Sequence, residues 1–172
     1  RMGSVAVVNL VIADSMAQVF VPGQDWERAL WVHALAVAVV ARTLATAAQP
    51  GPAVDVDLCY LGGLLHDVGR FILYLEAPAE LRAVDDTDWD TPATMLAAEI
   101  AICGFTHAEL GHRAALKWRL PAELQRIIRY HHTAPPYPVE LGAELARVVR
   151  LISCADRIAI MAVRCPTWPT LT

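Results

Sequence analysis

The residues of this chain with the most chemical potential are histidines and aspartates embedded in apolar sequence. His66 and Asp67 are adjacent within the run LGGLLHDVGR, which is apolar enough for the middle of a buried helix. Burying an imidazole and a carboxylate there is costly unless both find partners. A divalent cation offsets that cost, because it replaces the lost hydration and fixes the charge state of both groups. The alternative is a helix end at which both side chains reach solvent beside Gly69.

Five of the six histidines, together with Asp67 and Asp156, fall on an apolar helix face or at a helix end. A single histidine in such a place is usually a core residue with its own hydrogen bonds. A whole set of them favours one shared partner, since each polar group would otherwise have to be satisfied separately. Helical bundles build metal sites by projecting histidines and carboxylates inward from facing helices. The candidate ligands are His33, His66, Asp67, His107, His131, His132 and Asp156.

The donor atoms of this set restrict the metal. Imidazole and carboxylate ligands without thiolate suit one or two divalent transition metal ions, namely Fe, Mn, Zn, Ni or Co, and do not select among them. The cysteines show no C-x-x-C spacing and lie mostly among apolar residues, so we expect buried thiols and neither disulfides nor a zinc knuckle. These cysteines are Cys59, Cys103, Cys154 and Cys165.

The elements that position these ligands are predicted to be helices throughout. Thr91-Pro92 and the capping box that starts at Thr106 are firm helix starts, and no segment shows the period-two alternation of a strand. The acidic stretch from Pro78 to Trp89 is predicted to be a surface loop with room for one helical turn. We therefore predict an all-α fold, a single bundle of about seven helices around a central metal site. The predicted helices are Val5–Phe20, Asp25–Ala48, Val56–Glu76, Thr91–Cys103, Thr106–Arg119, Pro121–His132 and Glu140–Val163.

Length and composition set the remaining limits. A chain of 172 residues is long enough for one domain with a sizeable core. We expect residues 1–4 to be an expression remnant, residues 5–163 to form the helical domain and residues 164–172 to be a loose tail. The longest apolar run, Ala29–Ala41, is too short for a bilayer span, which needs roughly 20 residues. No signal peptide is recognisable, so no membrane span and a cytoplasmic location are predicted.

Charge argues against one class of partner. The formal net charge is −4, and the arginines between Arg113 and Arg150 recur singly on helical faces. A nucleic-acid-binding surface needs clustered Lys and Arg to neutralise phosphates. We therefore expect no nucleic acid partner.

The order of the candidate ligands resembles that of the HD superfamily of metal-dependent phosphohydrolases, whose pattern is H…HD…H…HH…D. The runs LWVH, GGLLHDVGR, GFTHAELG and WRLP are similar to the HDOD branch of bacterial signalling proteins. This resemblance covers roughly Val5 to Val163, and it corresponds to the later part of an HDOD domain. The related HD-GYP phosphodiesterases have a glycine-rich segment after HH, whereas TAPPYP follows His132 here, which argues against hydrolysis of cyclic di-GMP.

The resemblance implies two metal ions that share Asp67 as a bridge. One would be held by His33, His66, Asp67 and Asp156, and the other by His107, His131 and His132 together with Asp67. Two metals in such a site stabilise the attacking and leaving oxygens of a phosphoryl transfer. The expected substrate is a small nucleotide or another molecule that contains phosphate.

Arg70 stands where the family usually has a lysine. It is expected to neutralise phosphate oxygens, and the alternative is a surface charge near a helix end. His112 points to another face of its helix than His107 and is expected to lie at the surface or behind the ligands. Because many HDOD domains have lost ligands, the alternative function is a non-catalytic signalling or scaffold module that binds a protein partner or a nucleotide.

Overall fold

The computed structural model describes residues 11, 25–48 and 54–164. Its described elements are all helical, which confirms the predicted all-α fold. Apart from Val11, the helix expected over Val5–Phe20 lies outside the described residues, as does the tail from Cys165 on, whereas Arg164 still belongs to the last helix. The elements are α2 (Asp25–Ala47), α3 (Val56–Leu65), α4 (Val68–Glu76), α5 (Pro78–Asp85), α6 (Pro92–Cys103), α7 (His107–Lys117), α8 (Ala122–Tyr130), η1 (Val139–Leu141) and α9 (Gly142–Arg164).

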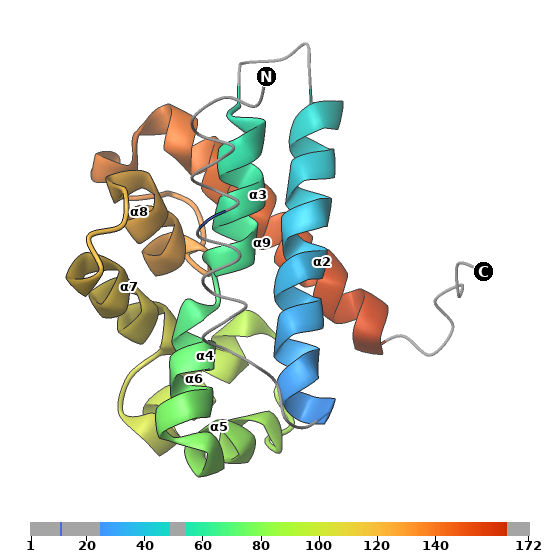
Figure 1. Ribbon diagram of the computed structural model, residues 1–172, viewed down its shortest axis with the longest axis vertical. Helices are drawn as coiled ribbons and strands as arrows, with labels where there is room; N and C mark the ends of the chain where they lie inside the picture. Colours follow the sequence, from blue (N-terminus) through green and yellow to red (C-terminus); the bar gives the residue numbers. More distant parts are fainter. Residues whose placement is uncertain (1–10, 12–24, 49–53, 165–172) are drawn as a thin grey trace.

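The helices surround the junction between α3 and α4. The long helix α2 lies beside α3, and α9 crosses both, as Figure 1 shows. Helices α7 and α8 pack against the other side of α3 and α4, while α5 and α6 pair at one end of the molecule. The junction therefore lies among α2, α7, α8 and α9.

The main apolar core fills the space between α2, α3, α8 and α9. Val37 on α2, Leu65 on α3, Ile127 on α8 and Ile152 on α9 are all buried within it. Burying a side chain of this size stabilises the fold by about 1.5–3 kcal/mol. One continuous core thus fixes four helices, of which α2 and α9 carry candidate ligands while α3 and α8 end directly before them.

The prediction of a single helix over Val56–Glu76 is wrong, because the helix is interrupted at His66-Asp67. Helix α3 ends at Leu65, Asp67 adopts φ −97° and ψ 18°, and α4 begins at Val68. In a continuous helix, successive side chains point about 100° apart. The break instead lets the adjacent His66 and Asp67 side chains reach the same centre.

Gly69 explains how α4 comes so close to α7. A Cβ atom on Gly69 would lie 1.9 Å from the carbonyl oxygen of His107, far inside van der Waals contact. Only a residue without a side chain fits there. The glycine two positions after Asp67 thus allows the Asp67 carboxylate to lie beside the first turn of α7.

Two further expectations are corrected. The predicted loop Pro78–Trp89 contains the helix α5, because Pro78 opens it and Leu81 and Val84, three residues apart, are buried against the fold. Among the described cysteines, Cys59 is buried and Cys103 is half-buried, but Cys154 is exposed, since α9 presents it to solvent. All three thiols are free, as expected.

Two helical segments are long and apolar enough by composition to cross a membrane, Arg28–Ala47 and Val56–Glu76. The most apolar window of the second is 72% buried inside the fold, which is typical of a core segment. The corresponding window of the first is 33% buried. Both segments carry candidate ligands, His33 on the first and His66 and Asp67 on the second.

Candidate metal centre

The structure brings all seven candidate ligands together at the α3–α4 junction. His33 comes from α2, Asp156 from α9, and His107 is the first residue of α7. The ligand atoms form two clusters, and within each cluster all of them lie within 4.8 Å of one another. We call these the Asp67 group, which is Asp67, His107, His131 and His132, and the Asp156 group, which is His33, His66 and Asp156.

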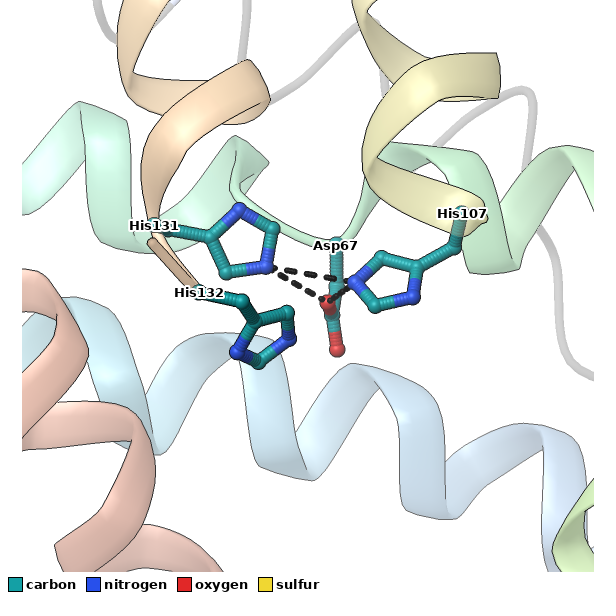
Figure 2. A group of neighbouring side chains, drawn as sticks. All are labelled: Asp67, His107, His131 and His132. Atoms are coloured by element: carbon teal, nitrogen blue, oxygen red, sulfur yellow. Dashed lines mark hydrogen bonds and ion pairs between the residues drawn. The ribbon is translucent and has the colours of Figure 1, made fainter. Parts of the chain in front are cut away.

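The Asp67 carboxylate lies between the two groups. Its Oδ1 is 3.2 Å from His107 Nε2 and 3.6 Å from His131 Nε2, as Figure 2 shows. Its Oδ2 is 3.6 Å from His33 Nε2 and 3.5 Å from His66 Nε2. One carboxylate thus turns one oxygen toward each group, as a ligand that bridges two metal ions does.

Two rings of the Asp67 group, those of His107 and His131, are held with their Nε2 atoms facing inward. His131 Nδ1 lies 2.8 Å from the carbonyl oxygen of Ile128, which can only accept, so this Nδ1 carries the proton. His107 Nδ1 donates in the same way to the Glu99 carboxylate at 2.7 Å. The two Nε2 atoms nevertheless face each other at 3.2 Å, beside Asp67 Oδ1. If both rings are neutral, three acceptors are in contact, and a proton or a metal ion between them would remove the repulsion.

Several buried atoms around the same point lack hydrogen bonds. They include Asp67 Oδ1, whose contacts to the two rings do not have hydrogen-bond geometry. A buried polar atom without a partner is costly and calls for an explanation. Their common position among ligand-type atoms fits a metal ion better than four separate defects. The other three are His66 Nε2, His132 Nε2 and Asp156 Oδ2.

The pKa shifts of His107 and Asp67 also favour positive charge at this point. Burial disfavours the charged form of His107, but the carboxylates of Asp67 and Glu99 outweigh burial and raise its pKa to about 9. Burial also opposes ionisation of Asp67, yet His66 and His107 hold the pKa of that carboxyl well below its usual range. A proton on His107 thus occupies the role that a metal ion would take.

The Asp156 group is more accessible. The His33 side chain is 19% exposed, and its Nε2 lies 3.1 Å from Asp156 Oδ1. Burial lowers the pKa of His33, but its hydrogen bond to Asp156 and the charge of Asp67 together raise it. His66 is completely buried, and burial lowers its pKa to about 4, so its ring is neutral at pH 7. A neutral imidazole is the form that binds metals.

Arg70 is buried behind His107, and its charge is neutralised within the protein. Its Nη2 pairs with Asp85, and its Nη1 lies 3.5 Å from Glu99 Oε1 and 3.6 Å from the sulfur of Met95. The contact to a substrate phosphate stays a prediction, and the observed ion pairs point to a different role.

Glu99 is the functional candidate that the sequence analysis missed. Its carboxylate is fully buried and binds both the ring and the backbone N–H of His107. The sequence feature that could have indicated it is a single charged residue within the apolar run MLAAEIAIC, eight residues before His107.

His112 lies apart from both groups. Its Nδ1 is 3.1 Å from the carbonyl oxygen of Gln125, and its Nε2 is 3.3 Å from Arg129. The ring therefore joins α7 to α8, consistent with the predicted place away from the ligands.

Comparisons with known proteins agree with this fold. The model of the HDOD domain family matches residues 1–134. An uncharacterized protein of Treponema pallidum (strain Nichols) is 26% identical over 140 residues, which cover 81% of this chain and 27% of that protein. The chain therefore spans about a quarter of the length of this relative.

Two solved structures are similar over most of this chain. One is an HDOD domain protein of unknown function from Geobacter sulfurreducens, with 25% identity and a TM-score of 0.70, covering 93% of this chain and 50% of that one. The other, from Shewanella amazonensis SB2B, has 22% identity and a TM-score of 0.69, covering 96% and 58%. The latter is named only as a candidate phosphohydrolase.

The family match includes all the ligands of the Asp67 group and leaves out Asp156, which α9 brings into the centre from beyond residue 134. With its helical fold and the ordered histidines and aspartates of its centre, the chain belongs to the HDOD domain family.

Proposed function

We propose that this HDOD domain holds two divalent transition metal ions and hydrolyses a phosphate ester or phosphodiester of a small nucleotide. The observation that carries the proposal is the Asp67 carboxylate, which turns one oxygen toward each ligand group. Two metals bound there would supply activation of water and stabilisation of the attacking and leaving oxygens. The ligand set fits Fe, Mn, Zn, Ni or Co, and we expect the protein in the cytoplasm of a bacterium.

The chain's own residues would position these ions and the substrate. Asp67 sets the spacing between the two groups, and the main-chain carbonyls of Gly63 and Ile128 fix the rings of His66 and His131. The partial exposure of His33 gives the centre an open side toward solvent. A substrate phosphate would enter on that side, because His107 and His131 are completely buried on the other.

The segment after His132 bears on substrate size. Residues 133–138 connect α8 to η1 and contain Pro135, Pro136 and Pro138, whose fixed φ angles limit adjustment of the backbone. The flexible glycine-rich segment expected of a cyclic di-GMP hydrolase is missing. A mononucleotide or a small cyclic nucleotide is therefore the better candidate.

The name of the Shewanella protein gives limited support, because 22% identity relates the folds alone. The decisive test is a screen of metal-loaded protein against mononucleotides, cyclic nucleotides and a chromogenic phosphodiester. We expect turnover that disappears in Asp67→Asn and persists in Asp57→Asn. The control residue is an exposed aspartate in the first turn of α3, close in sequence and outside the centre.

A second function, a non-catalytic module that binds a protein partner or nucleotide, is favoured by two observations. Arg70 is paired with Asp85 and Glu99 instead of facing a substrate. A groove of about 380 Å³ between α4 and α7 is lined by apolar side chains, among them Leu75 and Trp118, with Arg113 and Lys117 also lining it. Absence of turnover across the screen in metal-loaded protein would select this second function.

A further inference from the structure

Among the carboxylates of the described residues, Glu99 stands apart because it is completely buried and directed at a single ligand. Its Oε1 and Oε2 lie 2.7 Å and 2.8 Å from His107 Nδ1, and Oε2 also accepts the backbone N–H of His107 at 2.8 Å. Glu99 is on α6, whose other residues supply no ligand to the centre. The carboxylate therefore reaches the centre only through His107.

The other buried rings are held differently. His66 and His131 donate from Nδ1 to the main-chain carbonyls of Gly63 and Ile128, each three residues earlier in the chain. Those carbonyls are neutral, and their places are set by the helix itself. His107 is the first residue of α7, so no helical carbonyl precedes it, and a charged acceptor from another helix takes that place.

Arg70 holds Glu99 in position. Its Nη1 is 3.5 Å from Glu99 Oε1, and its Nη2 pairs with Asp85 at the end of α5. Arg70 lies three residues after Asp67 at the start of α4. The same turn of chain thus supplies the bridging carboxylate on one side of His107 and the cation that orients Glu99 on the other.

We propose that Glu99 is a positioning residue of the Asp67 group, oriented in turn by Arg70. It keeps the His107 proton on Nδ1, turns Nε2 toward the metal and makes that nitrogen a stronger donor, as carboxylates behind metal-bound histidines do. This inference rests on the proposed function in one respect only, that a metal binds the Asp67 group. It assigns Arg70 to the support of a ligand and not to the substrate.

Glu99→Gln tests the assignment, because it keeps the shape of the side chain and removes the charge and one acceptor. We expect the metal affinity of the Asp67 group to fall about ten- to a hundred-fold, while the affinity of the Asp156 group stays unchanged. Stepwise affinities from competition with a chromogenic chelator, using Zn²⁺ as the probe, separate the two groups. Glu109→Gln is the matched control, since Glu109 lies in the same turn as His107 and is exposed.

The outcomes distinguish this inference from the proposed function. If the wild type binds two ions and Glu99→Gln binds both equally well, Glu99 only caps α7 and the assignment is overturned, while the dinuclear centre stands. If the wild type binds no metal, the proposed function fails and this inference fails with it. If Glu99→Gln weakens binding at the Asp67 group and Glu109→Gln does not, the result supports both the dinuclear centre and the role of Glu99.

A measurement on the wild type decides the matter if Glu99→Gln does not fold. In Zn²⁺-loaded protein labelled with ¹⁵N at histidine, we expect a slowly exchanging, low-field proton on Nδ1 of His107, assigned by its absence in His107→Gln. A purely structural contact to the backbone N–H would not produce this signature. A His107 ring without that proton overturns the assignment.

Discussion

The two ligand groups are built from the same residue types but are enclosed to different degrees. In the Asp67 group, His107 and His131 are completely buried, and both rings are fixed through Nδ1. In the Asp156 group, His66 is held in the same way, but His33 is 19% exposed on α2. On the proposed function, the first group would retain an ion and the second would give access to one.

This difference follows from where the helices end. The Asp67 group is assembled at helix ends, where α3 gives way to α4, α7 begins and α8 stops. Two of the three ligands of the Asp156 group, His33 and Asp156, come from the middle of the long helices α2 and α9. Helix ends leave backbone groups free to orient side chains, whereas a side chain in the middle of a helix depends on packing alone.

The largest effect is expected at Asp67, because its carboxylate faces both groups. Asp67→Ala should abolish binding of both ions and leave the seven-ligand centre without its bridge, because each group loses a carboxylate oxygen. Elemental analysis after loading with Mn²⁺ or Zn²⁺ measures the change, with Asp57→Ala as the control. If Asp67→Ala retains two equivalents, Asp67 is not the bridge.

Single substitutions within each group should have smaller effects than Asp67→Ala and should distinguish the two groups. His131→Ala should remove one metal equivalent and also destabilise the protein by several kcal/mol, because it empties a completely buried position. His33→Ala should remove one equivalent with a smaller loss of stability, since His33 is partly exposed. Metal content and denaturant unfolding of both variants check this, and equal losses of stability would contradict the difference in enclosure.

The sequence predicted which residues converge better than it predicted how their side chains are held. A polar group in an apolar helix stands out, and His66-Asp67, His107 and Asp156 were recognisable for that reason. Their convergence in two groups agrees with the prediction. The helical fold was predictable because caps such as Thr91 and Thr106 mark helix starts locally.

The elements that were missed depend on contacts distant in sequence. The break at Asp67 has no proline to mark it, and it arises where Gly69 meets the carbonyl of His107. Glu99 gains its role from His107, and Asp85 gains its role from Arg70, both across the fold. Local periodicity carries no information on such pairs.

The enclosed group should also control the pH dependence of the metal-free protein. Since the folded state raises the pKa of His107 to about 9, its contribution to stability is full below the unfolded value near 6.5 and is lost as the pH rises through 9. The loss is at most about 3 kcal/mol. Below pH 6.5 the buried His66, with its pKa lowered to about 4, acts in the opposite sense, so stability falls as the pH falls.

Urea unfolding of chelator-treated protein from pH 5 to 9 measures this profile. We expect His107→Gln to flatten the alkaline side, and the metal-loaded wild type to lack the decline, because the ion replaces the proton. Metal-free wild type that is as stable at pH 9 as at pH 6.5 would exclude this role for His107.

The smallest expected effect is at His112, the histidine that belongs to neither group. Its Nδ1 lies 3.1 Å from the carbonyl of Gln125, so the ring joins α7 to α8 through a partly buried hydrogen bond and a second, exposed one to Arg129. His112→Ala should therefore cost about 1 kcal/mol and leave both metal equivalents in place. His107 lies five residues earlier on the same helix, and His107→Ala should instead remove one equivalent. Loss of metal in His112→Ala would mean that the Asp67 group depends on the contact between α7 and α8. Helix packing, and not the ligands' own hydrogen bonds, would then hold that group together.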